Sequence, residues 1–124
     1  MTGRSATTVT GNYLVIYARF HLKPGMRTRY LSILEVVLQG IKAEPLCKSI
    51  LVHEDPQNPD VVILYEIWAG TREAFDRDER NKPYRAEYAR ILPDLLSKPV
   101  EVDWLLPTVE WYSDIIGKDR SDGR

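Results

Sequence analysis

The chain has 124 residues and a net charge of −1, with 17 basic residues dispersed among 18 acidic ones. This length corresponds to one domain that can bury a core, and the balanced charge argues against nucleic acid or an anionic membrane as the main partner. One cysteine and two histidines do not make a spaced set of soft ligands, so no metal site is expected.

Residues 1–11 are small and polar, and we expect them to form a flexible N-terminal tail. The polar start carries no apolar leader, and the apolar runs are far shorter than the roughly 20 residues that span a bilayer. We therefore expect a cytoplasmic protein without a membrane partner. Residues 12–108 are expected to form the folded domain, and residues 109–124 a C-terminal extension that packs on a partner subunit.

Residues 13–22 alternate in hydrophobicity, as expected for a first strand. After the turn at residues 23–25, apolar side chains recur at helical spacing up to Ile41, which predicts an amphipathic helix of about four turns that ends before Pro45. Residues 46–54 alternate weakly and are interpreted as a second strand. The turn-forming residues 55–60 predict a hairpin loop of several residues.

Residues 61–68 form the most apolar strand of the chain, rich in β-branched and aromatic side chains. Alternation divides the strand into two faces: Val62, Leu64, Glu66 and Trp68 on one, and Val61, Ile63, Tyr65 and Ile67 on the other. Both faces are apolar along most of their length. Because an antiparallel sheet usually exposes one face to water, each face of this strand is expected to need its own cover.

Thr71 is placed as the N-cap of a short helix that runs to about Arg80. Pro83 suits the first position of a second helix, and Pro93 is expected to kink or end that helix near Leu92, with a separate turn carrying Leu95. Residues 100–106 alternate again and predict a fourth strand.

The order of these elements is strand, helix, strand, strand, helix, strand, which predicts an α+β fold of the ferredoxin-like βαββαβ type. Its helices cover one face of a four-stranded antiparallel sheet. A second copy of the chain would cover the other face, so we expect a homodimer in which Tyr13, Val15 and Tyr17, or the residues on the opposite face of that strand, are buried between two sheets.

Several short motifs, taken in order, resemble the antibiotic biosynthesis monooxygenase domain family over residues 13–107. They are Lys23-Pro24-Gly25, Glu44-Pro45-Leu46-Cys47, Glu54-Asp55-Pro56, Tyr65-Glu66-Ile67-Trp68, Ala74-Phe75 and Pro83-Tyr84. The resemblance implies a dimeric α/β barrel that oxidises phenolic or polycyclic aromatic substrates with dioxygen and without metal or flavin. Other members of this family degrade haem or isomerise small metabolites.

The chain departs from the family pattern after the Ala74-Phe75 pair. Many members have a histidine four residues after the alanine, where this chain has Asp78, followed by Glu79 and one extra residue before Pro83. This departure argues against a mechanism based on that histidine. The helix after Pro83 carries no histidine either, which argues against haem degradation.

Candidate catalytic residues are Trp68, Glu66 and Tyr84, with Glu66 as a buried base whose pKa is raised. Candidate pocket residues are Tyr88, Phe75, Leu64 and Asp78. The structural alternatives are that Glu66 pairs with an arginine or the backbone, that the tyrosines and Trp68 are core residues, and that residues 76–80 form a solvated helix face.

Three functions follow from these expectations. The leading one is a homodimeric, cofactor-independent monooxygenase that oxidises a phenolic, quinol-type or polycyclic aromatic substrate with dioxygen. The second is a non-catalytic dimer that binds a small molecule or regulates through it. The third is an isomerase or cyclase on the same barrel.

Overall fold

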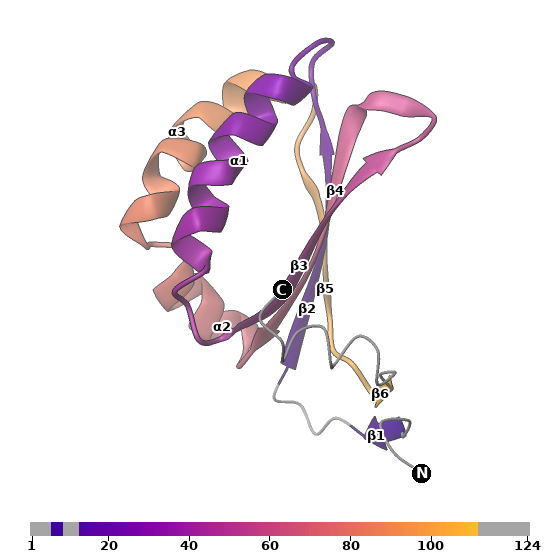
Figure 1. The fold of residues 1–124 in the computed structure, drawn as a ribbon, viewed down its shortest axis with the longest axis vertical. Coiled ribbons are helices and arrows are strands. Elements are labelled where there is room, and N and C mark those ends of the chain that lie inside the picture. The colour runs from indigo at the N-terminus through magenta and orange to yellow at the C-terminus, as the bar shows by residue number, and fades with distance from the viewer. Residues whose placement is uncertain (1–5, 9–12, 112–124) are drawn as a thin grey trace.

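The computed structural model describes residues 6–8 and 13–111 of the chain. Figure 1 shows a four-stranded sheet with the helices on one of its faces, and all neighbouring strands are antiparallel in the order β3-β4-β2-β5. The strands are β2 (Tyr13–His21), β3 (Cys47–Asp55), β4 (Asn58–Ala69) and β5 (Glu101–Leu105), and the helices are α1 (Arg27–Ile41), α2 (Arg72–Ala74), a π-helix (Phe75–Glu79), a 3₁₀ turn (Pro83–Arg85) and α3 (Ala86–Leu95). The predicted ferredoxin-like fold is confirmed.

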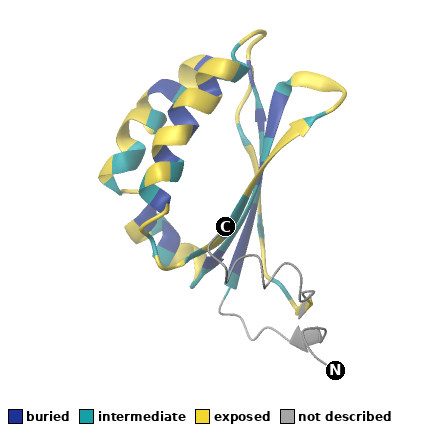
Figure 2. Cartoon of the chain, in the orientation of Figure 1, coloured by how far each residue is buried: buried dark blue, intermediate teal, exposed yellow. Residues whose placement is uncertain are grey.

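The core lies between the helices and the inner face of the sheet. Alternate residues of β2 turn their apolar side chains inward, and Ile16 pairs with Glu66 of β4 in the antiparallel register. From the other side, α1 buries the stripe that includes Tyr30, Leu34 and Val37. Figure 2 shows this inner stripe of the helix as buried and its outer surface as exposed. The predicted division of β4 into two faces therefore places Glu66 and Trp68 toward the helices.

The outer face of the sheet carries a row of large side chains. Tyr65 pairs with Leu51 of β3 on one side and with Tyr17 of β2 on the other. The helices lie on the opposite face in Figure 1. As a result Tyr17 and Tyr65 are only partly buried, and Leu51 and Leu105 are 52% and 47% exposed.

The β3–β4 hairpin is tighter than the expected loop over residues 55–60. Asp55 pairs directly with Asn58, so only Pro56 and Gln57 lie between the strands. The side-chain oxygen of Asp55 accepts from the backbone N–H of Gln57 at 2.9 Å, and that of Asn58 accepts from Asp60 at 3.0 Å. These local hydrogen bonds satisfy backbone groups within the turn, so the turn-forming residues extend the strands instead of separating them.

The expectation that a separate turn carries Leu95 was wrong, because α3 continues through Pro93 to Leu95. Pro93 has no backbone N–H to donate to the carbonyl of Ala89, and the helix nevertheless continues for two more residues. The carbonyl of Leu95 accepts from the backbone N–H of Lys23 at 2.8 Å, and Ser97 donates to the carbonyl of His21 at 2.8 Å. Tertiary contacts with the end of β2 therefore hold this last turn in place.

A second, two-stranded sheet was not expected from the sequence. Part of the predicted N-terminal tail forms β1 (Ala6–Thr8), which pairs antiparallel with β6 (Val109–Trp111). The remainder of the predicted C-terminal extension, residues 112–124, lies outside the described residues. None of the described helices is long and apolar enough to cross a membrane.

Candidate functional site

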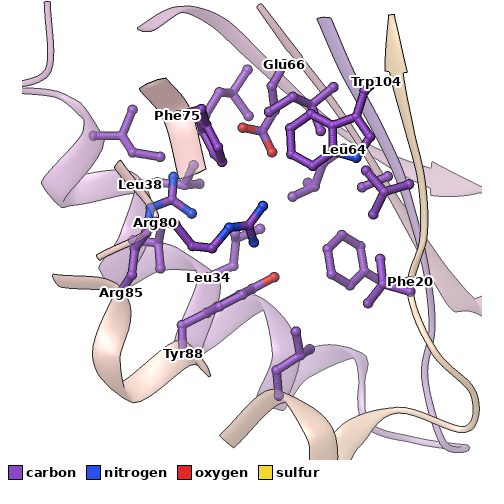
Figure 3. A pocket seen from close by; sticks show the side chains of 18 residues that line it. Phe20, Leu34, Leu38, Leu64, Glu66, Phe75, Arg80, Arg85, Tyr88 and Trp104 are labelled. Carbon is purple, nitrogen blue, oxygen red and sulfur yellow. The ribbon is translucent and has the colours of Figure 1, made fainter. Parts of the chain in front are cut away.

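A cavity of about 200 Å³ lies between the helices and the inner face of the sheet. Its wall is apolar or aromatic except for four side chains, namely Glu66, Arg80, Arg85 and Tyr88. Figure 3 shows the carboxylate of Glu66 and the hydroxyl of Tyr88 pointing into the cavity from opposite sides, with the two arginines between them. The cavity can therefore hold an apolar ring and offer it a few polar contacts.

Glu66 reaches this cavity because it alternates with Leu64 and Trp68 on the inner face of β4. The indole Nε1 of Trp68 donates to Oε1 of Glu66 at 2.9 Å. Burial raises the pKa of the Glu66 carboxyl, while the bond from Trp68 and the charge of Arg85 oppose part of that rise. The group therefore takes up a proton at a higher pH than an ordinary carboxylate, as a general base near neutrality requires.

Tyr88 forms the opposite wall and contacts Tyr30 of α1, with 2.9 Å between the two hydroxyl oxygens. Tyr30 is 0% exposed, so an O–H of Tyr30 without an acceptor would be costly. We therefore assign Tyr30 as the donor and Tyr88 as the acceptor. This assignment leaves the O–H of Tyr88 available to a molecule in the cavity, and burial raises the pKa of Tyr88, so its hydroxyl keeps the proton at neutral pH.

Arg85 is held by Glu79, a buried residue that is 5% exposed. Oε2 of Glu79 accepts from Nε of Arg85 at 2.8 Å and from the hydroxyl of Tyr84. Burial and the bond to Glu79 raise the pKa of Tyr84, so this tyrosine acts as a hydrogen-bond donor. Tyr84 and Glu79 thus position the guanidinium group of Arg85 beside the cavity.

The π-helix Phe75–Glu79 explains how Glu79 comes to be buried. The backbone N–H of Arg80 bonds to the carbonyl of Phe75 at 3.0 Å, which closes a turn one residue longer than an α-helical turn. This turn buries both Phe75 and Glu79. The interpretation of residues 76–80 as a solvated helix face therefore fails at Glu79, because it assumes the α-helical period.

The structure gathers four of the predicted site residues at the cavity, namely Glu66, Leu64, Phe75 and Tyr88. Trp68 lies behind this wall, where it contacts Glu66 and packs against Phe75 with ring centroids 5.2 Å apart. Tyr84 also lies behind the wall. Asp78 is placed away from the cavity, exposed and paired with the neighbouring Arg77 at 2.9 Å.

The lining residues that were missed from the sequence include Arg80, Arg85 and Trp104. Arg85 could have been found, because it lies three residues before Tyr88 and seven before Leu92 and so shares their helical stripe. A positively charged side chain on the apolar face of a helix is a candidate functional residue, because a buried charge is costly. Within the described residues, no cluster of three or more histidines, cysteines or acidic residues is arranged to hold a metal ion.

The family model described as antibiotic biosynthesis monooxygenase matches residues 13–90. Rv0793 of Mycobacterium tuberculosis is 29% identical over 97 residues, which cover 78% of this chain and 93% of that protein. Its solved structure has a TM-score of 0.68 with 27% identity, over 77% of this chain and 94% of that chain. A crystal structure named as an antibiotic biosynthesis monooxygenase shares the fold, with a TM-score of 0.65 and 18% identity over 74% of this chain and 95% of that one.

An uncharacterized protein of Synechocystis, sll1783, is 27% identical over 89 residues, which cover 72% of this chain. The matched region spans only 59% of the Synechocystis protein.

Proposed function

The chain belongs to the antibiotic biosynthesis monooxygenase family, and on that premise we propose that it oxidises a phenolic or quinol-type aromatic compound with dioxygen and without a bound cofactor. The observation that carries this proposal is Glu66, a carboxyl of raised pKa on the wall of an aromatic-lined cavity. Phenols react with dioxygen far more readily once they lose their proton. A base beside the ring is therefore the main requirement of such chemistry.

In the proposed reaction Glu66 takes the proton of the substrate hydroxyl, and the phenolate ring supplies electrons to dioxygen. One oxygen atom becomes a new carbonyl oxygen on the ring, and the other leaves as water with the hydrogens of the hydroxyl and of the oxidised ring carbon. The substrate thus supplies all the electrons. The free O–H of Tyr88 is available to stabilise negative charge that develops on oxygen in the cavity.

The size of the cavity supports a substrate with a single ring. A dry protein cavity of about 150 Å³ is large enough to bind benzene, and this cavity measures about 200 Å³. A ring with one or two small substituents fits this volume, whereas a polycyclic compound needs more space. Among the substrates implied by the family, monocyclic phenols and quinols are therefore favoured.

Oxygen uptake with a series of monocyclic hydroquinones tests the proposal, with ¹⁸O₂ and mass spectrometry to identify the product. We expect one labelled oxygen atom in the quinone product. Binding of the ring compounds without oxygen uptake would favour a non-catalytic binding protein. Conversion of a substrate in the absence of oxygen would favour an isomerase or cyclase.

We further propose that the chain acts as a homodimer through the outer face of its sheet. Support comes from the partly buried Tyr17 and Tyr65 and from Leu51, which is 52% exposed although it stands beside them. Sedimentation is expected to show a dimer for the wild type and a monomer for Leu51→Asp. Val36→Asp on α1, where the side chain is also 52% exposed, is the matched control and should remain a dimer. A monomeric wild type would contradict the proposal.

A further inference from the structure

Arg85 has a hydrogen-bond donor that nothing in the described part of the chain satisfies. Its Nε is bonded to Glu79, but its Nη2 is buried and has no hydrogen-bond partner among the described residues. The side chain is only 17% exposed, and it lines the cavity. A buried guanidinium nitrogen without an acceptor is costly, so a molecule that supplies an acceptor there gains affinity.

We propose that the substrate carries a carboxylate on its ring and that Nη2 of Arg85 donates a hydrogen bond to this carboxylate. The inference rests on the proposed function, because it takes the same cavity as the substrate site. It adds the substrate class, a hydroxylated aromatic acid, and it assigns Arg85 the role of selecting that class.

The surroundings of Arg85 favour an anion. Arg72, Arg80 and Arg85 approach one another on this side of the cavity, and the carboxylates that pair with them are those of Asp76 and Glu79. Asp76 is shared, since it lies 2.7 Å from Arg80 and 3.7 Å from Arg72. When Glu66 is neutral, three guanidinium groups face two carboxylates here, which leaves an excess of positive charge.

Aromatic rings keep these guanidinium groups near the cavity. Arg72 stacks over Trp104 at 4.3 Å from the ring centroid, and Arg80 and Arg85 each lie 5.5 Å from the centroid of Phe75. Both rings belong to the cavity wall. The charges of Arg80 and Arg85 are therefore part of the cavity wall, with Arg72 beside them.

The chemistry of the lining favours a carboxylate over a phosphate or sulfate. A phosphate presents oxygens in all directions and needs several donors, whereas the wall here is apolar apart from four side chains. Nη2 of Arg85 carries two N–H groups without an acceptor, which suits a planar group with two oxygens. Glu66 would repel an anion when ionised, and the positive charge of Arg85 opposes this repulsion.

Binding to the intact protein under anaerobic conditions tests the inference without relying on turnover. The probes are 2,5-dihydroxybenzoate and its methyl ester, which have the same ring and hydroxyl groups but differ in charge. Titration calorimetry at pH 7 should show the acid binding at least about tenfold more tightly than the ester, as expected for a hydrogen bond to a charged group. Arg85→Met should abolish this preference, and Arg85→Lys should retain part of it.

Arg90→Met is the matched control, since Arg90 lies on α3 with 73% of its side chain exposed. It should keep the full preference for the acid. The wild-type protein alone can refute the inference, even if Arg85→Met fails to fold. It does so if it binds the acid and the ester equally tightly, or if it binds neither compound. Oxygen uptake separates the two proposals. If the protein prefers the acid but consumes no oxygen, only the proposed oxygenase function is refuted. If it consumes oxygen with hydroquinone but shows no preference for acids, only the proposed binding of a carboxylate is refuted.

Discussion

The indole Nε1 of Trp68 donates a hydrogen bond to Oε1 of Glu66 across 2.9 Å. The two residues are two positions apart on β4, so the strand itself aligns the donor with the carboxyl on one face of the sheet. Burial favours the neutral form of Glu66, and the indole favours the ionised form. This opposition sets the pH range in which Glu66 can act as a base.

Trp68→Phe should raise the pKa of Glu66 further, because it removes a donor to the ionised carboxylate and keeps an aromatic ring beside Phe75. The rising limb of the pH dependence of kcat/KM should therefore move to higher pH, while the rate on the alkaline plateau changes much less. Steady-state rates from pH 5 to 9 check this prediction. An unchanged limb would show that the hydrogen bond does not control the reacting base.

Glu66→Gln should change how stability depends on pH. The folded state raises the pKa of Glu66 above the ordinary value of 4.5, so the folded state binds the proton more tightly than the unfolded state. The contribution of Glu66 is therefore fully present below pH 4.5 and is lost as pH rises through the raised pKa. Urea unfolding from pH 4 to 8 should show that the variant gains stability relative to wild type as pH rises. A constant difference between the two proteins would contradict the raised pKa.

Glu79→Ala should lower the free energy of unfolding by about 3 kcal/mol, because it leaves the buried Arg85 without its carboxylate. The neighbouring Asp78→Ala is the matched control. Asp78 is 57% exposed, so its loss should stay within about 0.5 kcal/mol. Urea unfolding compares the two variants, and equal losses would contradict the π-helical placement of Glu79.

Gly40→Ala should destabilise the protein although alanine favours helices. A Cβ at Gly40 would lie 2.2 Å from Cγ of Tyr84, so the ring that supports Glu79 must move. The expected cost is about 2 kcal/mol for this overpacking. In the Tyr84→Ala background the same change should become neutral or favourable, which a double-mutant cycle measures. A stabilising Gly40→Ala in the wild type would show that the helix can shift to accept the methyl group.

The sequence predicts the layers of this fold well, because strand alternation is a direct consequence of backbone geometry. Glu66 and Trp68 lie on the helix-facing side as the alternation of residues 61–68 predicts. The hairpin and the end of α3 were predicted less well. Asn58 favours turns and Pro93 disfavours helices, and hydrogen bonds within the hairpin and at the end of α3 outweigh these local preferences.

The candidate site was only partly predictable from the sequence. Leu64, Glu66 and Tyr88 were expected at the pocket because they fall on the inner faces of their elements, and they line the cavity. Glu79 was expected on a solvated helix face and is buried instead, because a π-helical turn has no clear sequence pattern and shifts the following residues out of the α-helical period. The extra residue before Pro83 is the one hint of this turn that the sequence offers.

The most direct test of the account is the rate of oxygen uptake by Glu66→Gln with a monocyclic hydroquinone substrate. Glutamine can still accept the hydrogen bond from Trp68 but cannot take up the substrate proton, so we predict a fall in kcat of at least about 100-fold with little change in binding. Glu87→Gln on α3, where the side chain is 64% exposed, should keep the wild-type rate. A Glu66→Gln protein that consumes oxygen at the wild-type rate would contradict the assignment of Glu66 as the base.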